Sequence, residues 1–203
     1  GITCEAFYTV LENAFYLDPS GSDDFGDLFI KRNGSGAVVK GVSVDLRMNY
    51  SKIIQLESGI TLQKSKYDNP VSYSNDLYAV SSFLKTPNIY GHANLSHMIN
   101  DNFNISLNYI YTGKMDLVHM GGSFNNPTDK YVSSNNFHQF DVNINYIQNL
   151  EKIGVKLNYL IGVKNLTNSY QSDFDILKNR DSNYVYGPST PRMLVIALSL
   201  SSL

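Results

Sequence analysis

Apolar and polar side chains alternate over the stretch from Val155 to Lys164. Its odd positions are apolar, and most of its even positions are polar or glycine. A period of two residues places successive side chains on opposite faces of an extended strand, so this stretch predicts a β-strand with one apolar and one wet face. The last part of the chain repeats the pattern, with one face made of Leu194, Ile196, Leu198 and Leu200.

The same alternation recurs along the whole chain. Further runs with strand character occupy about residues 2–15, 38–50, 54–63, 86–99, 103–111 and 139–146. With the two closing runs they make about eight strands, and no segment shows a convincing helical period. The expected fold class is therefore all-β, with strands that follow one another in an antiparallel meander.

The connections between these strands alternate in length. Tight turns are expected near residues 51–52, 100–102 and 150–152, and long polar loops over about 16–36, 66–85, 113–136 and 165–190. A soluble β-sandwich has no reason to place every long loop at one end. Transmembrane β-barrels do so, because short turns face the periplasm and long loops face the outside. The pattern predicts the wall of such a barrel.

The two faces of the predicted wall differ in chemistry. Tyr50, Phe103 and Tyr146 lie on the apolar face beside short turns, as expected for an aromatic girdle at a membrane interface. The polar face carries charges that a packed core would not accept unpaired but a lumen would. These predicted lumen-facing or plug-facing residues are Asp45, Arg47, Glu57, Asp141, Lys156 and Lys164. The alternative is a soluble sandwich whose polar faces point to solvent.

Composition excludes several other classes. The 203 residues contain no run of eighteen apolar residues, which excludes a transmembrane helix, and a net charge of −2 gives no reason to expect nucleic acid. Cys4 is the only cysteine, so an intrachain disulfide is impossible. Neither catalytic nor metal-binding spacing is present, and we expect no enzyme and no resident cofactor. The histidines, which are too scattered for a metal site, are His92, His97, His119 and His138.

Five segments of the sequence resemble one protein family. They read AFYTVLENAF at 6–15, AVVKGVSVDL at 37–46, YTGKM at 111–115, GVKNLTNSYQSDFD at 162–175 and RDSNYVYGPSTPR at 180–192. The last two are the specific ones. Together the segments cover nearly the whole chain, which resembles the C-terminal part of a TonB-dependent outer-membrane receptor of the sort common in Bacteroidetes.

This resemblance implies a fold and a function. Family members are 22-stranded barrels with a plugged lumen, so residues 1–203 would be the C-terminal third of the barrel, without the plug and the N-terminal strands. The implied location is the outer membrane of a Gram-negative bacterium. The implied function is energy-coupled uptake of a scarce nutrient such as a ferric siderophore, haem or cobalamin. The implied partners are the receptor's own N-terminal plug, the TonB–ExbB–ExbD complex acting through that plug, outer-membrane lipid and the nutrient complex.

The long loops contain the candidate ligand residues. Soft sulfur and imidazole groups at Met115, His119 and Met120 could bind haem or a transition metal. Further stacking surfaces for a siderophore or a corrin could come from aromatic rings, at Tyr131, Tyr184 and Tyr186. The plainer interpretation is that the two methionines and the histidine are ordinary loop and rim residues, and that the three tyrosines are aromatics of the extracellular girdle.

Two other functions remain open at this point. Eight strands can also close into a complete small barrel, which would act as an adhesin or a structural protein. That barrel needs a lumen packed with side chains, whereas the polar face here is lined by Gly, Ser, Asn and charged residues. A soluble β-sandwich acting as a binding module comes third.

Overall fold

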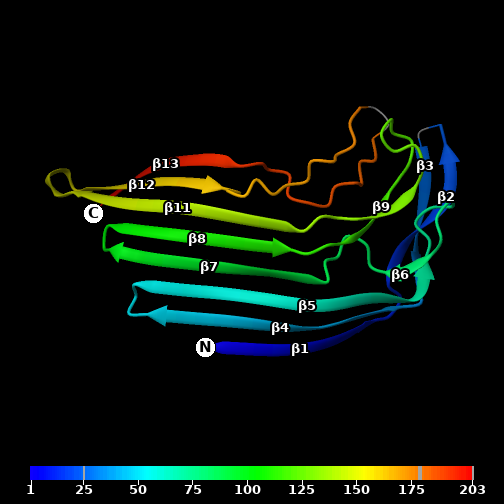
Figure 1. Cartoon of the computed structure of the whole chain (residues 1–203), viewed down its shortest axis with the longest axis horizontal. Coiled ribbons are helices and arrows are strands. Elements are labelled where there is room, and N and C mark those ends of the chain that lie inside the picture. The colour runs from blue at the N-terminus through cyan, green and yellow to red at the C-terminus, as the bar shows by residue number, and fades with distance from the viewer. Residues whose placement is uncertain (25, 178–179, 203) are drawn as a thin grey trace.

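The computed structural model describes residues 1–24, 26–177 and 180–202. Nine of its strands form one antiparallel sheet, and eight of these follow one another in a continuous path (Figure 1). The order of the strands in this path follows the sequence, and each strand pairs with the next strand of the path. In sheet order they are β1 (Ile2–Leu11), β4 (Ala37–Tyr50), β5 (Ile54–Val71), β7 (Ile89–Asn100), β8 (Phe103–Thr112), β11 (Phe137–Leu150), β12 (Val155–Lys164) and β13 (Met193–Ser202). The predicted all-β antiparallel meander is confirmed.

The turns at one end of the sheet are short, as predicted. Between β4 and β5 the chain reverses through Ser51 and Lys52, which both take positive φ angles of 48° and 62°. The β11–β12 turn is a single 3₁₀ turn, η1 (Glu151–Ile153), followed by Gly154 with φ 65°. Glycine adopts this left-handed conformation without a Cβ penalty, so it can end the turn and start β12.

The long connections at the other end contain structure that the sequence pattern did not reveal. The predicted loop over 16–36 is wrong, because β2 (Phe15–Asp23) and β3 (Gly26–Asn33) pair there as a hairpin. Its register shifts between Pro19 and Ser22, so a bulge accommodates residues that we expected in a loop. The predicted loop from residue 66 is also shorter than expected, since β5 continues to Val71.

Three more short strands occupy the long connections. The strand β6 (Val80–Ser82) pairs with the end of β5, and β9 (Asp116–His119) pairs with β10 (Lys130–Ser133) as a separate ribbon. Figure 1 shows the β2–β3 hairpin, β6 and β9 gathered at the same end of the sheet. Of the described residues in the β12–β13 connection, none belongs to a helix or a strand.

The pairing register separates the two faces of the sheet as expected. On the polar face, Ser43 lies opposite Thr61 and their hydroxyl oxygens are 2.9 Å apart, within hydrogen-bonding distance. On the apolar face, large side chains are exposed, with Ile196 71% and Leu200 68% accessible. The buried apolar side chains of the described residues all lie in or beside the long connections. An apolar face without a protein core behind it needs another apolar medium.

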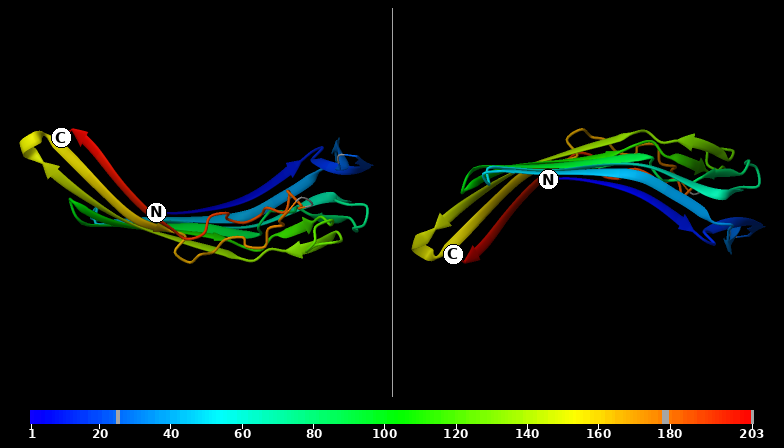
Figure 2. Two further views of the ribbon diagram at one scale, coloured as in Figure 1. Left: turned by 90° about the horizontal axis from the view of Figure 1, so that it is seen from above. Right: turned by 90° about the horizontal axis from the view of Figure 1, so that it is seen from below.

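The sheet is a single curved layer that does not close on itself (Figure 2). The strands β1 and β13 stand at its two ends, each paired on one side. The described strands form this layer and two short ribbons, rather than the two stacked sheets of a sandwich. Within the described residues, no helix has the length and apolar character needed to cross a membrane.

Candidate functional site

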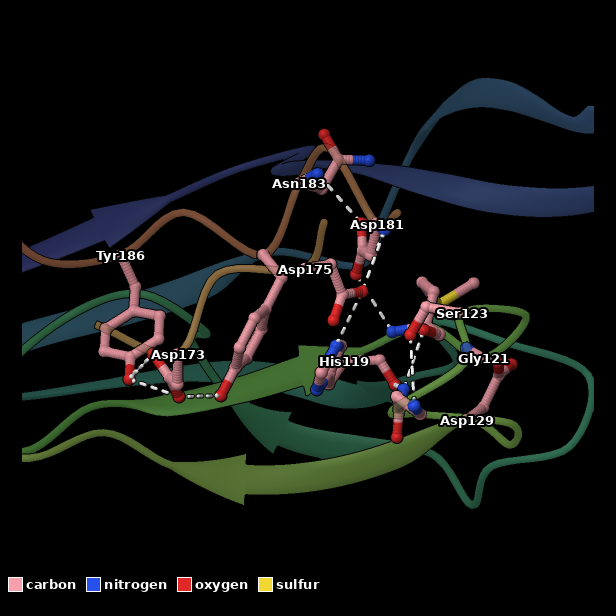
Figure 3. A network of polar contacts seen from close by, with 12 residues as sticks. His119, Gly121, Ser123, Asp129, Asp173, Asp175, Asp181, Asn183 and Tyr186 are labelled. Carbon is pink, nitrogen blue, oxygen red and sulfur yellow. Dashed lines mark hydrogen bonds and ion pairs between the residues drawn. The ribbon is translucent and has the colours of Figure 1, made fainter. Parts of the chain in front are cut away.

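Two long connections fold together at the loop end of the sheet. The β8–β11 connection (residues 113–136) supplies the β9–β10 ribbon, and the β12–β13 connection (residues 165–192) lies against it (Figure 3). The two share a small core of Met115, Leu117 and Tyr184, against which Val132 and Tyr186 pack. The contact joins residues far apart in the sequence, and we call it the loop cluster.

A buried hydrogen bond between a histidine and an aspartate ties the two connections together. Nε2 of His119, at the end of β9, lies 3.0 Å from Oδ2 of Asp175, and their side chains are only 9% and 3% exposed. The same Oδ2 accepts the backbone N–H of Asp181 at 3.0 Å. Burial by itself raises the pKa of Asp175, but the hydrogen bonds from Asp181 and His119 and the nearby imidazole charge outweigh it. The pKa of this carboxyl is therefore lowered.

One carboxylate holds two tyrosines beside this pair. The hydroxyl of Tyr184 donates to Asp173 Oδ2 at 2.9 Å, and the hydroxyl of Tyr186 reaches both Asp173 oxygens at 2.9 Å. Burial, followed by the contact with Asp173, raises the pKa of Tyr186 to about 12 and also raises the pKa of Tyr184. Both phenols therefore stay protonated donors at neutral pH, whereas a metal prefers a phenolate.

Buried amide side chains satisfy the backbone of the cluster. Gln171, which is 1% exposed, donates to the carbonyl of Tyr184 at 3.0 Å and accepts the N–H of Tyr186 at 2.9 Å. In the other connection, Asn126 donates to the carbonyl of Met120 at 2.8 Å. Because buried backbone groups need such partners, these amides fix the shape of loops that have little regular structure.

The structure brings together most of the predicted ligand residues, but several point inward. Met115, His119 and Tyr184 are 6–7% exposed and already engaged in the cluster. They would reach a ligand only if the loops opened. Tyr131 lies apart on β10, where its hydroxyl donates to the carbonyl of Tyr78 at 2.6 Å. A ligand-binding role for the predicted set stays a prediction.

Sequence reasoning missed the partners of these residues. Asp173, Asp175 and Gln171 lie within the QSDFD stretch, and Asp181 follows close behind. The signal available in the sequence was a group of acidic side chains in one long loop and a histidine in another. His119 and Asp175 are 56 positions apart, however, so spacing alone could not pair them.

A pocket of about 390 Å³ opens beside the loop cluster. Its walls come from the β2–β3 hairpin, the end of β5, the β5–β7 connection, β9 with the residue after it, and the β12–β13 connection. The predicted residue Met120 is part of the lining. The described residues that line the pocket are Leu17, Phe29, Tyr67, Tyr73, Phe83, Leu84, Lys85, Val118, Met120, Asp181 and Asn183.

The register places the predicted lumen charges on the polar face. Arg47 Nε lies 3.7 Å from Glu57 Oε1, with both side chains more than half exposed. Near the loop end, Asp141 Oδ1 accepts the N–H of Asn165 at 2.8 Å. Lys156 and Lys164 fall on the same face of β12 as Gly162, which lies opposite Asn143. Contact with a lumen plug stays a prediction for all of them.

Neither the described loops nor the described strands gather a metal site. In the part of the chain that the structure describes, no group of three or more His, Cys, Asp or Glu side chains is placed to hold a metal ion. His119 and Asp175 form a pair, and the other nearby carboxylates are bonded to tyrosines or to backbone N–H groups.

A single-layered antiparallel meander with all long loops at one end defines the architecture of a barrel wall. Similar folds occur in the ferric-catecholate import receptor Fiu from E. coli K12, with TM-score 0.66 and 20% identity. They also occur in the siderophore receptor PirA from Acinetobacter baumannii, with TM-score 0.65 and 14% identity, and in a G324V mutant of the ferric enterobactin receptor PfeA from Pseudomonas aeruginosa, with TM-score 0.63 and 16% identity.

These similarities cover the whole chain but only 25–29% of the three receptors. No model of a known family matches the sequence, and no curated protein matches it. The expected resemblance to a TonB-dependent receptor barrel is thus confirmed at the level of the fold.

Proposed function

We propose that residues 1–203 form the C-terminal part of an outer-membrane receptor barrel that takes up a scarce nutrient complex. The observation that carries this proposal is a sheet with an exposed apolar face, a polar face behind it and folded long loops at one end only. Lipid would cover the apolar face, the polar face would line the lumen, and the loops would capture the solute. Neighbours with this fold are receptors named for import or siderophores.

The remaining parts of the receptor follow from this proposal. The open edges of β1 and β13 would pair with further strands, which fits a chain that spans about a quarter of its structural neighbours. The lumen would hold an N-terminal plug, and the TonB–ExbB–ExbD complex would act on that plug. The solute is a ferric siderophore, haem, cobalamin or a similar complex, and no covalent chemistry is involved.

A complete eight-stranded barrel is less well supported. It would require β1 and β13 to pair with each other and close the sheet, whereas each of them is paired on one side only. The exposed side chains of these two strands would also have to face lipid around an eight-stranded barrel, which is much narrower than a 22-stranded one.

The test uses the full-length protein in its own cells. Deleting the gene should abolish uptake of one labelled complex from a panel of ferric siderophores, haem and cobalamin, and the protein should fractionate with the outer membrane. A strain without TonB serves as the control, since it should keep surface binding but lose uptake. Unchanged uptake of the whole panel, or recovery of the protein in the soluble fraction, contradicts the proposal.

A further inference from the structure

The pocket beside the loop cluster has the size and lining of a small-molecule site. Its volume of about 390 Å³ falls within the range of about 300–1,000 Å³ usual for ligand pockets. Such pockets are mostly apolar, with a few polar groups that orient the ligand. Five separate parts of the chain meet here, so the pocket exists only when the long connections are folded together.

Aromatic and aliphatic side chains make up most of its wall. The rings of Tyr67 and Phe83 pack against each other on one side of the pocket, with centroids 4.3 Å apart and planes tilted by 35°. Burial raises the pKa of Tyr73, so its hydroxyl stays neutral. Leu17 and Phe29 face the pocket from the β2–β3 hairpin, although they are 54% and 40% exposed. When an apolar group covers apolar surface left open in this way, the free energy falls.

The charged groups at the pocket are already engaged. Of the described lining residues, Lys85 and Asp181 carry charge, with opposite signs. The ammonium group of Lys85 donates to the carbonyl of Asn183. Asp181 accepts the N–H of Met120 at 2.9 Å and the N–H of Asn183 at 2.8 Å. The lining therefore carries no net charge, and a strongly charged ligand would lose its hydration here while meeting an ammonium and a carboxylate of opposite sign.

We propose that this pocket binds an uncharged aromatic or apolar group of a small molecule. The role of this group as part of a substrate rests on the proposed uptake function. There, the group belongs to the transported complex or to its organic ligand. The lining disfavours a highly anionic ferric catecholate complex seated directly in the pocket. The side-chain amide of Asn183 would orient the polar remainder of the molecule at the rim.

The test is photolabelling of the full-length protein in isolated membranes with benzophenone, an uncharged two-ring ketone. We expect adducts on Tyr67, Phe83 and Met120, mapped by mass spectrometry. The carboxylate analogue para-benzoylbenzoate has the same rings and should label these residues far less. Filling the pocket with Val118→Trp should remove the adducts. Phe124→Ala, at a residue that is 94% exposed and outside the lining, should not.

Equal labelling by the charged analogue overturns the proposal, and so do adducts confined to the apolar face of the sheet. The comparison of the two probes is made on the unmodified protein, so it stands even if Val118→Trp disturbs the loops. If the pocket is labelled but deletion of the protein leaves uptake unchanged, the transport function is contradicted and the binding site is supported. If uptake depends on the protein but the pocket is not labelled, the transport function is supported and the binding site is contradicted.

Discussion

The imidazole ring of His119 lies parallel to the phenol ring of Tyr184, with centroids 3.7 Å apart and an interplanar angle of 3°. His119 ends β9, and Tyr184 belongs to the β12–β13 connection. The same imidazole contacts Asp175, so one side chain joins the two loops both by stacking and by a hydrogen bond. The loop cluster therefore depends on a residue that sequence reasoning selected as a metal or haem ligand.

Replacing His119 with alanine should loosen the loops without unfolding the sheet. The change leaves the Asp175 carboxylate buried with fewer partners, which costs about 1–3 kcal/mol. Amide hydrogen exchange should rise across residues 165–177 and 180–192 and stay unchanged in β11 and β12. Tyr131→Phe is the matched control, because it removes one hydrogen bond outside the cluster. Unchanged exchange in His119→Ala would show that the hydrogen bond to Asp175 does not hold the loops.

Acid should open the loop cluster through Asp175. Its pKa is lowered from the ordinary value of 3.8, so the folded loops bind this proton less tightly than the unfolded loops do. The stabilisation is present above that ordinary value and is lost as the pH falls through the folded pKa. Protease sensitivity of the β12–β13 connection should rise over this acidic range. Asp175→Asn should flatten that rise, and an identical acid profile in the variant would rule out this carboxyl as its cause.

The strands could be predicted from the sequence because their signal is local. Alternation over Val155–Lys164 needs no knowledge of partners, and the turn residues near Ser51 and Gly154 mark where strands reverse. The loop cluster could not be predicted in this way. The contact between His119 and Asp175, and the burial of Gln171, depend on how two irregular segments fold on each other. The β2–β3 hairpin was missed because Pro19 and Gly21 lie at a bulge within the hairpin rather than in a loop.

Two neighbouring residues on β13 can test which face meets lipid. Leu198 lies on the apolar face and is 60% exposed, while Ser199 lies on the other face opposite Asn158. Leu198→Lys should destabilise the full-length barrel in a bilayer by about 2–4 kcal/mol, because a lysine there faces hydrocarbon. Ser199→Lys should cost much less. Denaturant unfolding in liposomes measures both, and equal losses would contradict the assignment of the faces.

Charge reversal at Arg47 can test the predicted plug contact. Its pairing with Glu57 is long and exposed, so it contributes at most about 1 kcal/mol to the wall. We expect Arg47→Glu to leave barrel assembly intact. Retention of the plug, measured by co-purification after cleavage at an engineered protease site between plug and barrel, should weaken. Lys52→Glu, in a short turn, is the control. Normal retention in Arg47→Glu would place this arginine outside the plug interface.

The meander also sets an order of events during biogenesis. Each strand of the wall pairs with its neighbour along the chain, so the sheet can grow one hairpin at a time with little loss of chain entropy. The contact between His119 and Tyr184 spans a much longer separation and needs the β12–β13 connection in place. The outer loops should therefore mature late, after the wall has formed. In the proposed receptor, a chain caught part-way through membrane insertion would have its strands but not its pocket.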